Sequence, residues 1–263
     1  MPASPKPLNI VKIKESTHCG NIHYFNSIDS TNSWLLENGE CGDICISEIQ
    51  TSGRGRRGNT WESPQGNISF SLCYCFAEIT EHWSLLGLIT GIAIAEALED
   101  IGLKGHGVKW PNDIFWKQKK LGGILLETSD QSGKVVIGIG LNISLPSKTH
   151  EKIGQAATCL TEAMATTNDM TLSKETLFTH LITRLHARFS NFDNLNFDHF
   201  IKSWRVWDIL RGKQVTFDHQ GTIISGEVIK IDKQGRLGIL KNSGEVCFYT
   251  SADIKLTKNG NSE

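Results

Sequence analysis

The segment that most constrains this chain is GRGRRGNTWESP, residues 53–64. Short apolar segments rich in strand-forming residues stand on either side of it, at 43–50 and 67–76, and predict two strands joined by this loop. Its three arginines offer planar, bidentate donors to carboxylates and phosphates. Trp61 adds a large apolar face directly after them. The loop is therefore expected to hold a small ligand that is partly anionic and partly apolar.

The loop also resembles two nucleotide-binding motifs and a nucleic-acid contact, but its sequence departs from each of them. Residues 53–58 match GxGxxG, but Pro64 and Gly66 follow where a dinucleotide-binding motif needs a helix. The loop also approaches a Walker A sequence, except that Asn59 stands where that motif has its phosphate-binding lysine. Contact with nucleic acid would need a wider basic surface, and the chain has a formal net charge of −1. A solvated basic loop without a ligand remains open as an alternative.

The cysteines and the apolar segments bear on compartment. Seven cysteines without CxxC spacing, and no signal-peptide pattern, predict reduced thiols in a cytoplasmic protein. The ligand clusters that zinc requires are missing from the sequence. The longest apolar stretch, residues 83–102, is interrupted at Glu96, short of the ~20 residues of a membrane span. It predicts a buried helix that ends at Gly102, and no contact with a membrane is expected.

Patterns along the chain predict an α+β protein. Helical patterns cover residues 30–39, 83–102, 174–189 and 197–207, and strand candidates after the long apolar helix cover 106–116, 121–129 and 134–144. From about Arg211, short strands alternate with glycine-containing turns. The predicted fold is a mixed, largely antiparallel sheet with helices mainly on one face in residues 1–210. A small SH3-like β-barrel of five or so strands follows in residues 211–263.

Further motifs accompany the arginine loop. They are STN at 30–32, VKWPNDIFWKQKKLGGILLE at 108–127 and GIGLN at 138–142. Together with GRGRRG and W-x-S-P-x-G-N, these motifs resemble the biotin protein ligases, in that family's order, over most of residues 25–145. The C-terminal strands are similar to the family's small barrel. The resemblance implies a fold like that of class II synthetases and biotin ligases. It also implies a two-step reaction in which ATP activates biotin to biotinyl-5′-AMP, and biotin is then transferred to an acceptor lysine.

The resemblance also assigns roles to individual residues. It implies biotin contacts at Ser30, Thr31, Gln50, Gly53, Arg54, Arg56, Lys120 and Gly123, and ATP contacts at Arg56, Trp61, Asn112 and Asn142. Hydroxyl and amide side chains suit the ureido ring of biotin, which needs both donors and acceptors. The implied catalytic residues are Lys120, which would bridge the biotin carboxylate and the α-phosphate, Arg54 and Asp113. Asn142 would also lie near a magnesium ion carried with ATP.

Some of these assignments have competitors. Lys109 of KWPND is the other choice for the bridging cation, and Asp113 is alternatively a turn-capping carboxylate. The chain departs from the family's usual pattern at Thr51-Ser52 and at Gly122, and neither change removes a functional group. Lipoate or octanoate transferases are expected to share the fold but to lack GRGRRG and KWPND. A non-enzymatic binding protein would be expected to lose Lys120 or the arginine loop.

The expected partners follow from the same resemblance. They are biotin, ATP with Mg²⁺, and a biotin carboxyl carrier protein or domain, with the chain a monomer or a homodimer. DNA binding is not expected, because too few residues precede Ser30 for a winged-helix domain and the chain has no net positive charge. The polar segment 144–158 is expected to close over the adenine when nucleotide binds.

Overall fold

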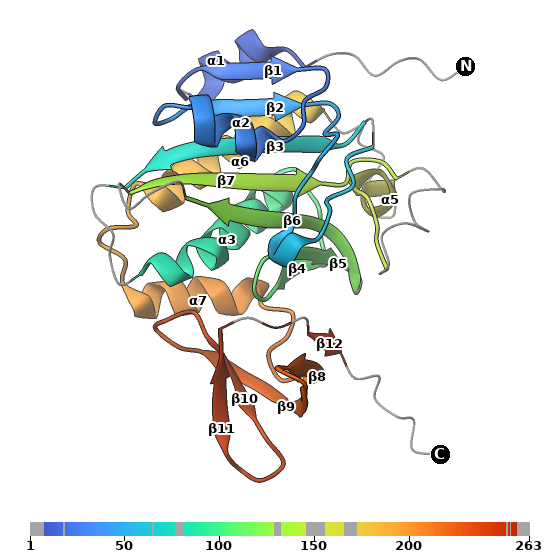
Figure 1. Ribbon diagram of the computed structural model, residues 1–263, viewed down its shortest axis with the longest axis vertical. Coiled ribbons are helices and arrows are strands. Elements are labelled where there is room, and N and C mark those ends of the chain that lie inside the picture. The colour runs from blue at the N-terminus through green and yellow to red at the C-terminus, as the bar shows by residue number, and fades with distance from the viewer. Residues whose placement is uncertain are drawn as a thin grey trace.

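The computed structural model describes residues 8–17, 19–64, 66–76, 82–128, 133–145, 156–165, 173–250, 252 and 254–256. They form a seven-stranded sheet covered by helices and a separate five-stranded sheet at the C-terminal end of the molecule (Figure 1). The predicted mixed, largely antiparallel α+β architecture with a small C-terminal sheet is confirmed. The position of the boundary between residues 210 and 211 stays a prediction.

The seven-stranded sheet has the strand order β1-β2-β3-β7-β6-β5-β4. Its strands are β1 Ile22–Phe25, β2 Ile44–Ser47, β3 Ile68–Cys75, β4 His106–Lys109, β5 Asp113–Trp116, β6 Lys119–Glu127 and β7 Lys134–Leu141. β1 pairs with β2 in parallel, and the other neighbouring strands are antiparallel. The single strand expected at 106–116 is instead the hairpin β4–β5. The turn between them contains a cis Trp110–Pro111 bond, and proline cannot donate to a strand ladder.

The helices are α1 Ile10–Thr17, α2 Thr31–Asn38, α3 Leu86–Asp100, α5 Leu160–Ala165, α6 Lys174–Phe189 and α7 Phe197–Trp207, with 3₁₀ turns η1 Arg56–Gly58 and η2 Trp83–Leu85. Four of them, α2, α3, α6 and α7, lie where the sequence patterns predict helices. The sequence reasoning did not predict α1, β1 or α5. Each has eight residues or fewer, which gives a periodic pattern few repeats, and α1 buries only Ile13.

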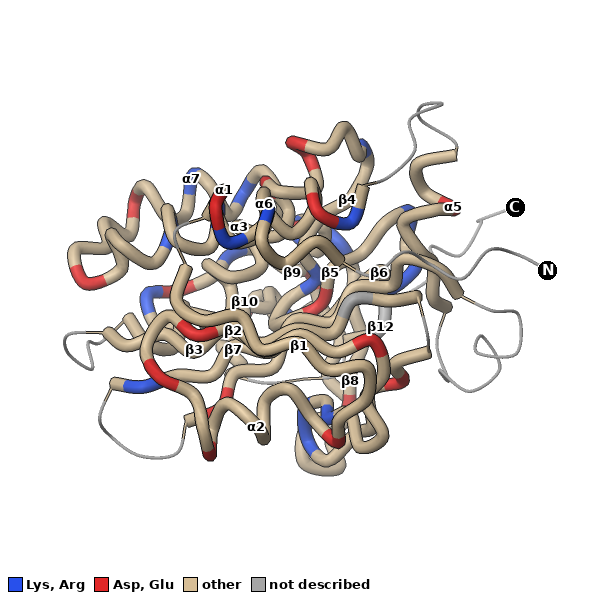
Figure 2. Tube along the Cα trace, turned by 90° about the horizontal axis from the view of Figure 1, so that it is seen from above, with Lys and Arg blue, Asp and Glu red and all other residues tan. Residues whose placement is uncertain are grey.

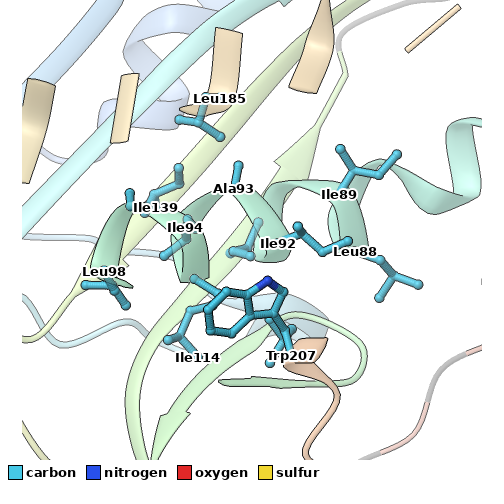
Figure 3. Packing of buried hydrophobic residues seen from close by; sticks show 14 of the residues in the cluster. Leu88, Ile89, Ile92, Ala93, Ile94, Leu98, Ile114, Ile139, Leu185 and Trp207 are labelled. Atoms are coloured by element: carbon cyan, nitrogen blue, oxygen red, sulfur yellow. The ribbon is translucent and has the colours of Figure 1, made fainter. Parts of the chain in front are cut away.

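Side chains alternate between the two faces of the large sheet. Ile44, Leu72 and Ile137 belong to the main core, which contains most of α3 and α6. α3 is buried nearly all round because it lies between the sheet and the helices α6 and α7 (Figure 3). The intervening residues Cys45 and Cys73 point to the opposite face and pack with Leu35 of α2, Val136 completing this smaller cluster. Helices therefore cover mainly one face, as predicted, and α2 alone among the described helices packs on the other.

The C-terminal sheet has the order β11-β10-β9-β8-β12, with all neighbours antiparallel. Its strands are β8 Gln214–His219, β9 Thr222–Ile231, β10 Leu237–Leu240, β11 Val246–Tyr249 and β12 Lys255–Leu256. The β4–β5 hairpin holds this sheet against the rest of the molecule. The indole Nε1 of Trp110, which is 2% exposed, donates to the carbonyl of Gly235 at 2.9 Å. The second residue of KWPND is thus a docking residue for the C-terminal sheet.

Replacement of Trp110 by Phe tests this docking contact. The change removes a buried donor and leaves the Gly235 carbonyl without its partner. Trp110→Phe is expected to lower the free energy of unfolding by about 1–3 kcal/mol. Urea unfolding followed by circular dichroism measures it. An unchanged unfolding midpoint would show that the hydrogen bond does not hold the C-terminal sheet.

Cys41 and Cys75 form a disulfide, so the expectation of seven reduced thiols is wrong at these two positions. The backbone N–H of Gly42 donates to the carbonyl of Cys73 at 2.8 Å, which brings the segment before β2 to the end of β3. The Cα atoms of the two cysteines are consequently 5.5 Å apart, a separation typical of disulfides. The other five cysteines are free: Cys19, Cys45, Cys73, Cys159 and Cys247.

The sequence predicts no membrane span, no zinc site and no DNA binding for the whole chain. The structure bears on these predictions for its described residues only. Within these residues, no helix is long and apolar enough to cross a membrane. No group of three or more His, Cys, Asp or Glu side chains in the described ranges is placed to hold a metal ion. Basic and acidic residues are interspersed along the described trace (Figure 2).

Candidate active site

A pocket of about 750 Å³ opens on the face of the large sheet that carries α2. Its floor is a row of residues that the strand register aligns. Ser69 of β3 lies opposite Gly140 of β7, Gly140 opposite Gly123 of β6, and Gly123 opposite Asp113 of β5. Residues opposite one another in a sheet point to the same face. Small side chains therefore leave the pocket open in the middle of the sheet, with one carboxylate at the end of the row.

Two glycines of the floor make room for Trp61. A Cβ atom on Gly140 would lie 2.3 Å from the indole ring, and one on Gly123 would lie 3.2 Å from it. The ring consequently rests on the backbone of β6 and β7. Lys120 Nζ lies 5.6 Å from the ring centroid. Gly140 of GIGLN and Gly123 of β6 thus supply the surface on which the tryptophan of the arginine loop is seated.

The charged residues of separate motifs meet above this floor. Lys120 Nζ is 2.8 Å from Asp113 Oδ1, and both side chains are less than one-fifth exposed. Arg56 Nη1 donates to Asn112 Oδ1 at 3.1 Å, and the Asn112 amide donates to the carbonyl of Ile124. Burial, and then the neighbouring Arg57, lower the pKa of the Arg56 guanidinium. Arginine nevertheless stays protonated at neutral pH, so Arg56 and Lys120 present two cations to the pocket, and Lys120 contacts the Asp113 carboxylate.

Lys109, the competing choice for the bridging cation, also lines the pocket. It stands at the end of β4, opposite Asp113 in the register, with Nζ 4.9 Å from the ring centroid of Phe115. Lys120 Nζ contacts the Asp113 carboxylate at the end of the glycine row and also lies near the Trp61 ring. The geometry favours Lys120 for contact with a ligand's anionic groups.

A set of hydroxyl and amide groups forms one wall. Ser30 caps α2 by accepting from the backbone of Ser33. The backbone N–H and the hydroxyl of Thr31 both donate to Gln50 Oε1, at 2.9 and 3.0 Å. Gln50 Nε2 in turn donates to Ser63 Oγ at 3.0 Å. The predicted residues Ser30, Thr31 and Gln50 are therefore brought together. The Gln50–Ser63 bond connects them to the C-terminal end of the arginine loop.

The arginine loop itself is a short hairpin. Arg54 and Thr60 form an antiparallel bridge, and the N–H of Gly55 donates to the carbonyl of Asn59 at 2.7 Å. A Cβ on Gly53 would lie 2.4 Å from the carbonyl oxygen of Trp61, so the hairpin needs glycine there. These cross-loop contacts direct the arginine and tryptophan side chains into the pocket lining.

Asn142 is 4% exposed and lines the pocket at the end of β7. Its side-chain amide donates to the carbonyl of Thr158 at 3.1 Å.

Residues 146–155 of the predicted lid, 144–158, lie outside the described residues. At the end of this segment, Lys120 N–H donates to the carbonyl of Ala156, and Thr158 N–H donates to the carbonyl of Lys120. The backbone of Lys120 is thus paired with the chain that leaves the segment.

The sequence reasoning missed several polar residues around the pocket. They are Asn32, Ser63, Ser69, Ser71 and Glu127, all of which take part in hydrogen bonds among the pocket walls. One signal was available: Ser69 and Ser71 occupy alternate positions of β3, the period of one sheet face. Their hydroxyls lie on the same face as the glycines opposite them, and so belong to the pocket side of the sheet.

Comparison with known proteins fits this geometry. Residues 24–144 match the model of the Biotin/lipoate A/B protein ligase family. The bifunctional ligase/repressor BirA of Salmonella typhimurium is 32% identical over 262 residues, which cover 96% of this chain and 80% of that protein. This chain belongs to the biotin protein ligase family. The biotin–[acetyl-CoA-carboxylase] ligase of Mycobacterium tuberculosis is 28% identical over 86% of this chain and 85% of its own length.

Solved structures of the family share the fold. The biotin protein ligase of Aquifex aeolicus in complex with biotin and ATP superposes with a TM-score of 0.76. It is 26% identical, over 90% of this chain and 99% of its own. The resemblance stated from the sequence motifs is therefore confirmed as family membership, and the residue roles that it implied stay predictions.

Proposed function

We infer that this enzyme is an ATP-dependent biotin protein ligase, which activates biotin to biotinyl-5′-AMP and transfers it to a lysine of an acceptor protein. The observation that carries this conclusion is the meeting of Lys120, Asp113 and Arg56 above the glycine floor. They come from two segments of the chain, the arginine loop and the β5–β6 hairpin, and form one cationic centre. Such a centre suits a reaction between two anions, a carboxylate and a triphosphate.

In the first step, a carboxylate oxygen of biotin attacks the α-phosphorus of ATP, the bond to the β-phosphate oxygen breaks, and pyrophosphate leaves. Negative charge gathers around the phosphorus, and fixed cations stabilise it more strongly in the transition state than water does. Lys120 is proposed to bridge the carboxylate and the α-phosphate. Arg54 and Arg56 are proposed to hold the anionic groups on the loop side of the pocket.

In the second step, the amine of the acceptor lysine attacks the acyl carbon, the bond to the phosphate oxygen breaks, and AMP leaves. A lysine amine is mostly protonated at neutral pH, so it must lose a proton before it attacks. Asp113 is proposed to orient that amine and accept the proton. Its contact with Lys120 places a carboxylate within the cationic centre, where both steps occur.

The remaining contacts are proposed from the residues that line the same pocket. Ser30, Thr31, Gln50 and Gly123 are proposed to contact biotin, together with Arg54, Arg56 and Lys120. Gly53, which lies beside the Gln50 amide, is proposed to contact biotin from the edge of the pocket. Trp61, Asn112 and Asn142 are proposed to contact ATP, together with Arg56. Magnesium is expected to arrive on the phosphates, since Mg²⁺ often relies on one or two carboxylates plus substrate oxygens. Asn142 is the residue proposed to lie near the magnesium ion, indirectly through the ATP phosphates.

The proposal extends to the acceptor, the compartment and the oligomeric state. The acceptor is proposed to be a biotin carboxyl carrier protein or domain, and the enzyme to act in the cytoplasm as a monomer or a homodimer. The Cys41–Cys75 disulfide argues for a more oxidising environment. Sedimentation gives the oligomeric state, and alkylation of thiols at the moment of cell lysis shows whether the disulfide exists in the cell.

One assay separates the ligase from its alternatives. The purified protein is incubated with biotin, ATP, Mg²⁺ and a biotin acceptor domain, and the acceptor is analysed by mass spectrometry. Biotin on the acceptor lysine supports the proposed function. Lipoate on a lipoyl domain, supplied in a parallel reaction, would instead support the lipoate transferases. No transfer in either reaction would support a binding protein.

Gly140→Ala tests the seat of Trp61. The added methyl would occupy space that the indole ring now fills, so the ring must move. If Trp61 contacts ATP, the variant is expected to bind ATP about tenfold more weakly, since an aromatic contact contributes about 0.5–1.5 kcal/mol. Gly87→Ala in α3 is the matched control, because its methyl would meet Leu126 at an ordinary 3.5 Å. Equal ATP affinity in both variants, measured by calorimetry, would contradict the proposed Trp61 contact.

A further inference from the structure

Glu127, the last residue of β6, joins two walls of the pocket and has no role among the residues assigned above. Its Oε2 atom accepts a hydrogen bond from Arg54 Nη2 at 3.0 Å and another from Asn32 Nδ2 at 2.7 Å. Arg54 belongs to the arginine loop, and Asn32 to the first turn of α2. One carboxylate therefore connects the loop to the helix beside the pocket.

The Asn32 side chain is fixed on its other side as well. Asn32 is 3% exposed, and its Oδ1 lies 2.5 Å from Ser71 Oγ, which is also 2.7 Å from Thr31 Oγ1. A Cβ on Gly138 would lie 2.3 Å from Asn32 Oδ1, so only glycine leaves room for this arrangement. The contacts run without interruption from the Arg54 guanidinium to the Thr31 hydroxyl, two groups that are proposed to bind biotin.

The ion pair between Arg54 and Glu127 is partly exposed, with side-chain exposures of 42% and 25%. Pairs of this kind contribute little to the stability of a fold. Their effect on binding is different, because an arginine that is already held in one orientation loses less freedom when a ligand binds. The expected signature of Glu127 is therefore a change in ligand affinity without a comparable change in stability.

We propose that Glu127 is a positioning residue for biotin: its carboxylate holds the Arg54 guanidinium in the orientation that meets the ligand's carboxylate. This rests on the proposed function, in which Arg54 contacts biotin. Asn32 anchors Glu127 from the opposite side, so the carboxylate does not follow the arginine into solvent. Glu127 is the last residue of the 108–127 motif, and its hydrogen bonds link that motif to Arg54 of the arginine loop and to Asn32 of STN.

A double-mutant cycle tests the proposal. Glu127→Gln keeps the shape of the side chain and one oxygen that can accept from Asn32, but it removes the charge that faces Arg54. We expect the Kd for biotin, measured by calorimetry without ATP, to rise about tenfold, the size of one charge-assisted hydrogen bond. The rate of adenylate formation at saturating biotin should change by less than about twofold. In the Arg54→Ala background, Glu127→Gln should change the Kd by less than about twofold, because its partner is gone.

Two further variants serve as controls, and their Kd for biotin is measured in the same way. Glu99→Gln removes a carboxylate from the exposed pair with Lys104 at the end of α3 and should keep the wild-type Kd. Glu127→Asp keeps the charge but withdraws it from Arg54 by one methylene. It should weaken biotin binding by a factor between those of the wild type and Glu127→Gln. It also serves as the test if Glu127→Gln fails to fold by circular dichroism. Wild-type affinity in the folded Glu127 variant, or equal Kd changes in the two Arg54 backgrounds, would overturn the positioning role.

The result also separates this inference from the proposed function. A wild-type protein that binds biotin and labels the acceptor, together with an unaffected Glu127 variant, overturns only the role of Glu127. A wild-type protein with no affinity for biotin overturns the proposed function, and the role of Glu127 falls with it.

Discussion

Lys120→Ala is expected to slow formation of biotinyl-5′-AMP by at least about 100-fold, the loss typical of removing one group that stabilises transition-state charge. Lys120 provides the cation that contacts Asp113 in the pocket lining, and its side chain is 17% exposed. Without it, the carboxylate of biotin and the α-phosphate would approach one another with less opposing charge. Pyrophosphate release measured in a single turnover gives the rate of this step directly.

The neighbouring lysine supplies a matched control for that variant. Lys119 Nζ pairs with Glu162 at 3.1 Å on the exposed side of β6, so Lys119→Ala removes the same side chain without touching the pocket. It should keep the wild-type rate, and Lys109→Ala should have a smaller effect than Lys120→Ala. Circular dichroism checks that each variant is folded. A normal rate in Lys120→Ala, or a larger loss in Lys109→Ala, would show that Lys120 is not the bridging cation.

Arg56→Gly should release biotinyl-5′-AMP about ten to a hundred times faster than the wild type, since a charge-assisted hydrogen bond contributes about 1.5–3 kcal/mol. Arg56 is held over the pocket by Asn112, and burial makes it a poorly hydrated donor that favours an anionic partner. The acyl-adenylate reacts with water and with exposed amines. Its early release should therefore label lysines of bystander proteins, while adenylation itself continues.

Variants of Arg57 and Arg54 are compared with Arg56→Gly. Arg57 already has a left-handed backbone with a φ of 56°, which suits glycine, so Arg57→Gly changes the charge without straining the loop. It should retain the adenylate better than Arg56→Gly does. Arg54→Ala should weaken biotin binding before any adenylate forms. Dissociation of radiolabelled adenylate and mass spectrometry of a bystander protein measure both effects. Equal retention by wild type and Arg56→Gly would mean that Arg56 does not hold the adenylate.

The sequence by itself determined what depends on neighbouring residues. The periodicity of α6 and α7 predicted both helices at their observed bounds, because an apolar face recurring every three to four residues is a local property. Ser30 and Gly39 predicted the two ends of α2 for the same reason. The motifs also named Lys120, Asp113 and Arg56 as site residues, since the family resemblance attaches roles to motifs rather than to distances.

Only the tertiary structure decided how separate segments meet. Strand register aligned Ser69, Gly140 and Gly123 in one row, and nothing in any of the three strands alone reveals that partnership. The same holds for the cysteine pair, since a sequence separation of 34 residues does not indicate proximity. Glu127 reads in sequence as an ordinary strand-end carboxylate, and it contacts two residues of the pocket lining because β6 ends beside both the arginine loop and α2. Local patterns fix where an element begins and ends, whereas contacts between elements arise from packing many side chains at once, and the geometry of this site consists of such contacts.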